Sequence, residues 1–204
     1  MEKVVINSLG NRISFLRLIP LYLSIIIFIL DFNLWIKVLG ILLLVITFFM
    51  DYVDGYCSKK TKTNSKFGGV VDVMIDRVVE SSYWITFLFL GFIPIWIVLL
   101  MLLRYFVTDG FRSVALMYRM GTFEMMKSPL GKFIVGSRFS RGFFSVFKVI
   151  TFSFLGILTI NTPFILNNFE TMKIIGLTLT IILLLYNLVR GFYTVKDTLG
   201  SISN

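Results

Sequence analysis

The chain has 204 residues, of which 57% are hydrophobic and 15% charged, and its formal net charge is +9. Its mean hydropathy of +0.89 lies far outside the range of soluble domains and indicates an integral membrane protein. With no histidine and one cysteine, imidazole and thiolate metal sites and an intrachain disulfide are excluded, so a bound metal would be an oxygen-liganded hard cation such as Mg²⁺ or Mn²⁺. In so apolar a chain, the positive charge indicates loops that face an anionic lipid surface rather than nucleic acid.

Six apolar stretches are long enough to cross a bilayer, which takes about 20 helical residues. They predict an all-α integral membrane fold with transmembrane helices near 13–30, 34–49, 69–90, 94–116, 143–160 and 174–189. Residues 31–33 leave room only for a tight hairpin between the first two helices, and the Gly and Pro of 91–94 predict the turn between the third and fourth. We expect residues 1–204 to form a single membrane domain, with no separate soluble domain.

The lysines and arginines are unevenly distributed along the chain. If the N-terminus is cytoplasmic, only Lys37 and Lys173 lie near the opposite face, which is a steep positive-inside bias. The bias predicts a multi-pass protein of the cell membrane with both termini in the cytoplasm. Arg17 interrupts the first apolar run and no clear small-residue cleavage site follows, so we expect the first helix to be retained rather than cleaved as a signal peptide.

Four carboxylates, those of Asp51, Asp54, Asp72 and Asp76, lie where the second and third predicted helices meet the cytoplasmic surface. Their spacings of three and four residues place each pair on one face of its helix. Ionised carboxylates that face one another at a membrane boundary repel strongly unless cations lie between them. The pattern therefore predicts a divalent metal site. The basic loop 56–67 between the pairs suits phosphate groups, although it is also typical of a plain positive-inside loop.

The fixed positions within residues 51–76 read DxxDGxxSK, eight residues, GxxxDxxxD, and are Asp51, Asp54, Gly55, Ser58, Lys59, Gly68, Asp72 and Asp76. The pattern resembles the signature of the CDP-alcohol phosphotransferase family, DxxDGxxAR, eight residues, GxxxDxxxD. Ser58 and Lys59 stand where the family has Ala and Arg. Three further segments resemble the phosphatidylglycerophosphate synthase branch: GNRISFLR at 10–17 resembles PNxxTxxR, RYFVTDGFR at 104–112 resembles REFxVTGLR, and Gly131-Lys132 resembles the start of GKxKT.

The resemblance implies an enzyme with two divalent ions, Mg²⁺ or Mn²⁺, and a homodimer. It implies that Asp51, Asp54 and Asp72 ligate the ions and that Asp76 is both a ligand and the general base. The residues expected to bind the CDP-lipid are Asn11, Ser14, Arg17, Asp54, Gly55, Ser58, Lys59 and Gly68. Glycine allows a nucleotide to approach the backbone closely, although both glycines also suit a helix end and a helix start. Lys59 supplies charge to a diphosphate but lacks the planar fork of arginine.

Arg104 lies inside an apolar helix, where an unpartnered guanidinium costs at least ~2.5 to 3.5 kcal/mol. A water-filled cavity that binds the phosphate of an anionic acceptor would explain it, since arginine forks suit phosphate. The cationic residues predicted to converge there are Arg104, Arg112, Lys132, Arg138 and Arg141. Three alternatives stay open: Arg138 and Arg141 as ordinary loop charges, Asp109 as an ion-pair partner of Arg104, and Glu80 as a partner of Arg77.

These observations predict a membrane phospholipid synthase that transfers the lipid phosphate of CDP-diacylglycerol or CDP-archaeol to glycerol 3-phosphate and releases CMP. The same chemistry with inositol phosphate or serine as acceptor is the first alternative. An ion transporter is an alternative of another class, and it would place the charges near the bilayer midplane rather than at one face. A catalytically impaired family member with a binding role is a third, because Ser58 and Lys59 depart from the signature.

Overall fold

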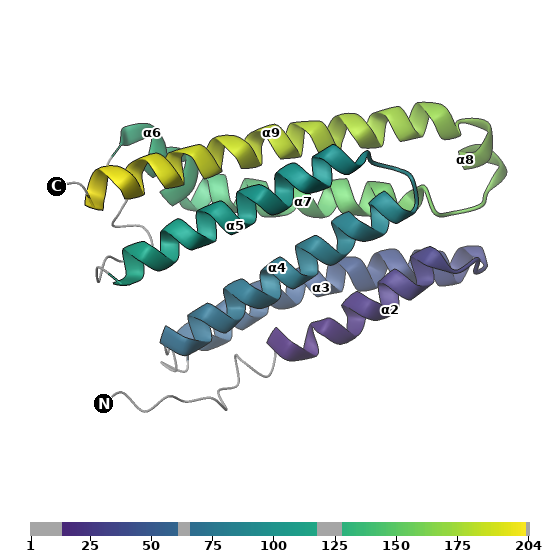
Figure 1. Cartoon of the computed structure of the whole chain (residues 1–204). Coiled ribbons are helices and arrows are strands. Elements are labelled where there is room, and N and C mark those ends of the chain that lie inside the picture. Colours follow the sequence, from purple (N-terminus) through teal and green to yellow (C-terminus); the bar gives the residue numbers. More distant parts are fainter. Residues whose placement is uncertain (1–13, 61–65, 118–127, 203–204) are drawn as a thin grey trace. The chain divides into compact units, whose positions relative to one another are not determined.

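The computed structural model describes residues 14–60, 66–117 and 128–202, and the side chains of 14–51, 70–114 and 128–201. Throughout these residues the chain forms helices joined by short connections (Figure 1). The elements are α2 (Leu18–Ile29), α3 (Leu34–Lys60), α4 (Lys66–Phe89), α5 (Ile95–Met117), α6 (Pro129–Gly131), the π-helix η1 (Lys132–Gly136), α7 (Arg138–Ile157), α8 (Pro163–Asn167) and α9 (Phe169–Ile202). One long helix coincides with each of the six predicted apolar stretches, and the all-α fold class is confirmed.

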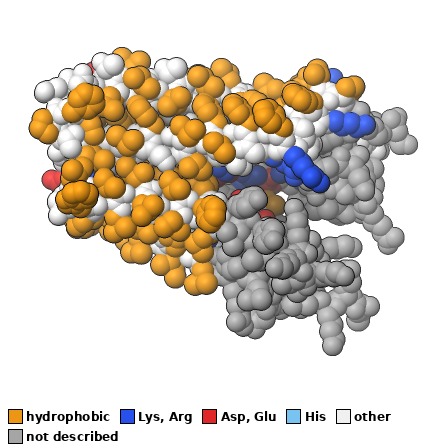
Figure 2. Space-filling model, turned by 180° about the vertical axis from the view of Figure 1, so that it is seen from behind, with side chains coloured by type: hydrophobic (Ala, Val, Ile, Leu, Met, Phe, Trp, Pro, Cys, Tyr) orange, Lys and Arg blue, Asp and Glu red, His pale blue; other side chains and the backbone are white. Residues whose placement is uncertain are grey.

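Among the described residues, three stretches are helical, long and apolar enough to cross a membrane: Leu34–Asp51, Arg138–Ile157 and Phe169–Ser201. A shorter apolar helix covers Ser14–Ile29. Large apolar side chains cover much of the described surface in Figure 2, and Trp35 is 79% exposed. Such a surface is unfavourable in water and suits contact with lipid. The membrane character is therefore supported, whereas six spans and cytoplasmic termini stay predictions.

The chain divides into two compact units, which are described separately. The first combines Met1–Phe92 with Phe152–Ile174, and the second combines Ile93–Thr151 with Ile175–Asn204. The first unit contains α2, α3 and α4, and the second contains α5, α6, η1 and most of α9. The single-domain organisation expected for residues 1–204 stays a prediction.

The predicted hairpin between α2 and α3 is confirmed. The Asn33 side chain accepts a hydrogen bond from the Ile36 amide at 3.1 Å, which caps the start of α3. The buried Lys37 ammonium donates to the Phe28 carbonyl in the last turn of α2 at 3.1 Å, so it satisfies an acceptor that the helix end leaves open. A Cβ at Gly40 would lie 2.7 Å from Ile27 Cγ2. The missing side chain therefore allows the two helices to approach closely.

The predicted turn between α4 and α5 is also confirmed. Gly91 has a φ of +72°, in the left-handed region that glycine adopts without strain. The Gly91 amide donates to the Leu88 carbonyl at 2.9 Å, and the Phe92 amide donates to the Phe87 carbonyl at 3.0 Å. These two bonds form the Schellman arrangement that ends many helices.

Each helix of the first unit turns one face toward a shared core. Residues three or four positions apart share a helix face. The core-facing residues are Arg17, Leu21, Ser24 and Phe28 on α2 and its entry, Gly40, Leu44, Thr47 and Asp51 on α3, and Asp72, Asp76, Val79, Tyr83 and Phe87 on α4. Apolar and small residues occupy the middle of each face, and charged residues occupy one end.

Aromatic packing fixes how these faces meet. The Tyr83 ring centroid lies 5.7 Å from that of Phe48 and 5.6 Å from that of Phe152. The Tyr83 hydroxyl forms a 2.9 Å hydrogen bond with Ser24 Oγ, which links α4 to α2. Two turns of α4 separate Tyr83 from Asp76, so the orientation that buries the ring also turns the carboxylate toward α2 and α3.

Candidate active site

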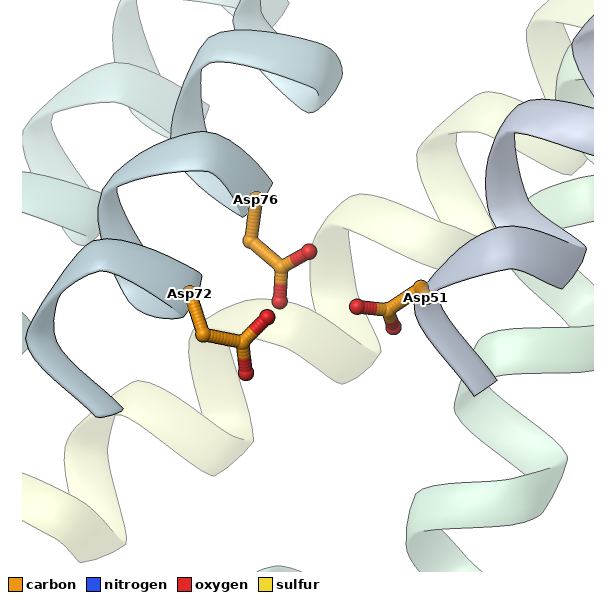
Figure 3. Close-up of side chains that lie close together, drawn as sticks. All are labelled: Asp51, Asp72 and Asp76. Atoms are coloured by element: carbon orange, nitrogen blue, oxygen red, sulfur yellow. The ribbon is translucent and has the colours of Figure 1, made fainter. Parts of the chain in front are cut away.

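Three of the four predicted metal ligands come together in the first unit. Asp51, Asp72 and Asp76 each offer a carboxylate oxygen, and these oxygens all lie within 4.8 Å of one another. Figure 3 shows Asp51 on α3 facing the two aspartates of α4. The Asp51 and Asp76 side chains are 39% and 35% exposed, so water and a polar ligand can reach them.

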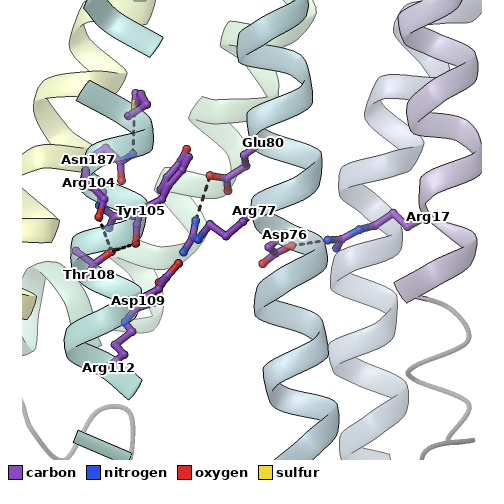
Figure 4. Close-up of polar contacts among 11 residues, drawn as sticks. Arg17, Asp76, Arg77, Glu80, Arg104, Tyr105, Thr108, Asp109, Arg112 and Asn187 are labelled. Atoms are coloured by element: carbon purple, nitrogen blue, oxygen red, sulfur yellow. Dashed lines mark hydrogen bonds and ion pairs between the residues drawn. The ribbon is translucent and has the colours of Figure 1, made fainter. Parts of the chain in front are cut away.

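Arg17 bridges this cluster. Its Nη1 lies 2.5 Å from Asp51 Oδ1, its Nη2 lies 2.5 Å from Asp76 Oδ1, and its side chain is only 2% exposed. Figure 4 shows the guanidinium reaching Asp76 from the entry to α2. The planar fork of arginine suits two carboxylates at once, and its charge offsets part of their mutual repulsion. The structure thus places Arg17 among the carboxylates, and its predicted role in CDP-lipid binding stays a prediction.

Glu80, one turn beyond Asp76, is buried and accepts a hydrogen bond from Arg77 Nη1 at 3.3 Å (Figure 4). The alternative that Glu80 pairs with Arg77 is therefore confirmed. A buried carboxylate needs such a partner, so a structural role explains Glu80.

Two arginines of the second unit, Arg190 and Arg104, belong to helices that contact each other. Arg190 of α9 is buried, and its guanidinium carbon lies 4.8 Å from the Phe144 ring centroid, a cation–π distance. Its neighbour Gly191 faces Arg104 of α5: a Cβ at Gly191 would lie 3.0 Å from Arg104 Cγ and 3.2 Å from its Nε. The missing side chain at Gly191 thus gives Arg104 room to cross α9 beside Arg190.

A family model described as CDP-alcohol phosphatidyltransferase matches residues 7–199. The chain belongs to this family. It is also 31% identical over 75 residues to the CDP-diacylglycerol–glycerol-3-phosphate 3-phosphatidyltransferase of Bacillus subtilis (strain 168). That match covers 37% of this chain and 39% of the relative, so it spans well under half of either protein. The family predicted from the signature at 51–76 is confirmed.

The carboxylates of this family member fit a divalent cation. The cluster offers only oxygen ligands, from three different positions and within 4.8 Å of one another, which is the donor set that Mg²⁺ and Mn²⁺ prefer. Asp54, the fourth predicted ligand, belongs to α3, but its side chain lies outside the described part of the chain. The identity and number of the ions stay predictions.

The structure describes little of the predicted CDP-lipid site. Asn11 lies outside the described residues, and Ser14 is buried at the entry to the first helix. The backbone of the other members belongs to α3 or α4, while their side-chain environment is outside the described part: Gly55, Ser58, Lys59 and Gly68.

The remaining predicted acceptor residues lie in the second unit. Arg112 Nη1 lies 3.7 Å from Asp109 Oδ1, one helical turn away, and forms an ion pair with it, while the alternative of Asp109 as a partner of Arg104 stays a prediction. Arg141 Nε donates to the Ser137 carbonyl at 3.4 Å. Lys132 and Arg138 are exposed. The convergence of Arg112, Lys132, Arg138 and Arg141 with Arg104 on one phosphate stays a prediction.

Arg190 was absent from the predicted acceptor residues. The sequence contains a signal for Arg190, which directly follows the apolar run that starts at Ile174. The free-energy cost of a guanidinium in an apolar helix is the same argument that singles out Arg104. The adjacent Gly191 leaves room for the Arg104 side chain, a role that depends on the packing of α5 on α9 and is not evident from the sequence.

Proposed function

We propose that this protein is a membrane phospholipid synthase that transfers the phosphatidyl or archaetidyl group of CDP-diacylglycerol or CDP-archaeol to glycerol 3-phosphate, with release of CMP. The observation that carries the proposal is the half-buried cluster of Asp51, Asp72 and Asp76, in which Asp51 directly follows the apolar residues 34–50 of α3. A substrate with lipid tails and a charged nucleotide needs a site of this kind, at the boundary between lipid and water.

In the proposed reaction one bond to phosphorus forms and one breaks, and a side chain of this protein accepts the proton. The acceptor hydroxyl oxygen forms a bond to the lipid-side phosphorus of the diphosphate, and the bond from that phosphorus to the bridging oxygen breaks. The bridging oxygen leaves with CMP. Asp76 takes the hydroxyl proton, a contribution of about 10²- to 10⁴-fold in rate. Arg17 holds the carboxylates of Asp51 and Asp76 in orientation.

Asp51, Asp54, Asp72 and Asp76 are the residues that would hold the divalent ions. When bound, such ions neutralise the diphosphate oxygens and make CMP a better leaving group. Lys59 adds a positive charge at the nucleotide in place of the arginine of the family signature. The family resemblance implies a homodimer, and the distribution of lysine and arginine implies a cell-membrane protein with the active site open to the cytoplasm; both belong to this proposal.

Glycerol 3-phosphate is favoured as the acceptor by the arginines. Arg104 and the buried Arg190 both belong to the second unit, and arginine forks suit the phosphate of an acceptor. Serine lacks such a phosphate. The Bacillus subtilis relative is a CDP-diacylglycerol–glycerol-3-phosphate 3-phosphatidyltransferase, and this supports the same choice of acceptor. Arg112, Lys132, Arg138 and Arg141 complete the proposed acceptor site.

The other classes of function fit the structure less well. A transporter needs charges near the bilayer midplane, whereas in the sequence Asp51 follows the apolar residues 34–50 and precedes a polar, basic segment. A protein that only binds substrate would keep the acid cluster but would release no CMP.

An acceptor panel tests the proposal. Purified protein in detergent with CDP-diacylglycerol or CDP-archaeol and Mg²⁺ should release CMP with glycerol 3-phosphate and much less with serine, inositol or inositol phosphate. Arg104→Gln and Lys132→Ala should raise the KM for glycerol 3-phosphate while leaving the KM for the CDP-lipid nearly unchanged. Turnover with serine or inositol phosphate but not with glycerol 3-phosphate would show that the acceptor is wrong. No CMP release with any acceptor would favour the binding role.

A further inference from the structure

The helix α9 holds the segment that precedes Lys132. Asp197 of α9 is buried, and its Oδ2 accepts hydrogen bonds from Ser128 Oγ at 2.7 Å and from the Ser128 amide at 3.4 Å. Ser128 Oγ in turn accepts a hydrogen bond from the Gly131 amide at 3.0 Å, and the Ser128 carbonyl accepts one from the Lys132 amide at 2.9 Å. A single carboxylate therefore anchors the whole turn from Ser128 to Lys132.

Gly131 is the residue that allows this anchor. A Cβ at Gly131 would clash with Asp197 Oδ2, would lie 2.6 Å from Ser128 Oγ and would lie 3.3 Å from Asp197 Cγ. The carboxylate could avoid a methyl group only by leaving Ser128. The resemblance found at Gly131-Lys132 thus has a physical basis: the glycine makes room for Asp197, and the lysine follows at the end of the anchored turn.

The π-helix Lys132–Gly136 is also linked to α9 at its middle residue, Ile134, through Ser140 of α7. Ser140 Oγ donates to the Ile134 carbonyl and forms a 2.6 Å hydrogen bond with the Tyr186 hydroxyl. π-Helical turns are rare and often occur at functional sites. The start and the middle of this one are thus linked to residues of α9 through Ser128 and Ser140.

Tyr186, Arg190 and Asp197 are separated by four and seven residues, so they share one face of α9. The face that carries the buried Arg190 is therefore the face that holds the segment with Lys132. Both cations belong to the proposed acceptor site.

We propose that Asp197 is a positioning residue for the acceptor: through Ser128 and Gly131 it sets where Lys132 is presented to the acceptor phosphate. This inference rests on the proposed function. A carboxylate strengthens the hydrogen bond from Ser128, and a buried carboxylate without such donors would be costly. Because Asp197 is buried and acts through Ser128, its loss should weaken acceptor binding while leaving the transfer step intact.

Steady-state kinetics test the inference. Asp197→Ala and Ser128→Ala should each raise the KM for glycerol 3-phosphate by roughly tenfold, which corresponds to the loss of about one charge-assisted hydrogen bond. The kcat and the KM for the CDP-lipid should change by less than about threefold. Asp197→Asn and Ser128→Thr keep an acceptor and a hydroxyl, respectively, and should restore most of the affinity. The double variant Asp197→Ala/Ser128→Ala should be no worse than either single variant.

Thr194→Ala is the matched control, because Thr194 is also buried on α9 and its hydroxyl bonds to the Arg190 carbonyl of its own helix at 2.9 Å. It should leave the KM for glycerol 3-phosphate unchanged. An equal loss of kcat and of both substrate affinities in Asp197→Ala would overturn the inference and indicate a general role in folding.

A spin label on Leu130→Cys gives a readout that needs no activity, since Leu130 is 56% exposed within the anchored turn. The background is Cys57→Ser, which removes the chain's one native cysteine. Asp197→Ala should increase the mobility of the label, and Thr194→Ala should not. Unchanged mobility would overturn the inference, whatever the substrate.

The two proposals can fail separately. If Lys132→Ala raises the KM for glycerol 3-phosphate and Asp197→Ala does not, the positioning role is wrong and the proposed function stands. If glycerol 3-phosphate is not turned over at all, the proposed function and the acceptor role of the turn both fail, while the label mobility still decides whether Asp197 holds the turn.

Discussion

Replacing Arg17 by glutamine should make the stability of the folded protein depend on divalent metal. In the structure the guanidinium lies between Asp51 and Asp76, whose carboxylate oxygens are within 4.8 Å of each other. Two unit charges about 4.8 Å apart repel by roughly 3 to 4 kcal/mol at an effective dielectric constant of about 20. Both carboxylates are more than a third exposed, so screening by solvent reduces this to about 1 to 2 kcal/mol.

Thermal unfolding in detergent measures this effect. For a chain of this size, a loss of about 1 to 2 kcal/mol lowers the Tm by roughly 2 to 8 °C. Arg17→Gln should show this loss in EDTA, and Mg²⁺ should close most of the gap because a bound cation replaces the missing positive charge. Lys173→Gln, which removes a positive charge from the start of α9, should match the parent in both conditions. Equal Tm values for Arg17→Gln and the parent in EDTA, or a gap that Mg²⁺ leaves untouched, would refute the reasoning.

Three further predictions follow from the site and the helix packing. EDTA should abolish CMP release and Mg²⁺ or Mn²⁺ should restore it, while Asp51→Asn should be folded by circular dichroism but inactive; full activity in EDTA would contradict the metal site. Lys59→Arg should keep or lower the KM for the CDP-lipid and Lys59→Ala should raise it, and an unchanged KM for the alanine variant would place Lys59 outside the site. Gly40→Ala should lower the free energy of unfolding by about 1 to 3 kcal/mol, because its methyl group would lie 2.7 Å from Ile27 Cγ2. Gly142→Ala is the control and should be neutral or stabilising, because a Cβ at Gly142 would have nothing within 4 Å. Equal stabilities of the two variants would contradict the close packing of α2 on α3.

Hydropathy located every long helix but not its full length. The second apolar run was expected to end at residue 49, whereas α3 continues to Lys60, and the last was expected over 174–189, whereas α9 covers Phe169–Ile202. An apolar run reports only the part of a helix that faces lipid or core. The helix continues past it into polar sequence, and in α3 this polar end carries part of the family signature.

Spacing along the chain accounts for the pair Asp72 and Asp76, because residues at i and i+4 on α4 share a face wherever the helix packs, whereas Asp51 joins them from α3 by tertiary packing. Contacts between distant segments follow from tertiary packing instead. Arg17 reaches Asp76 across 59 residues, and Ser128 reaches Asp197 across 69. No local pattern specifies either pair. The elements α6, η1 and α8 are also too short to produce a periodic signal.

The central claim is tested most directly by following both products of one reaction. Purified protein with CDP-diacylglycerol, Mg²⁺ and radiolabelled glycerol 3-phosphate should move the label into a chloroform-soluble phospholipid and release CMP in equal amount, and Asp72→Asn should do neither. CMP release without labelled lipid, or labelled lipid formed equally well by Asp72→Asn, would contradict transfer at the carboxylate cluster.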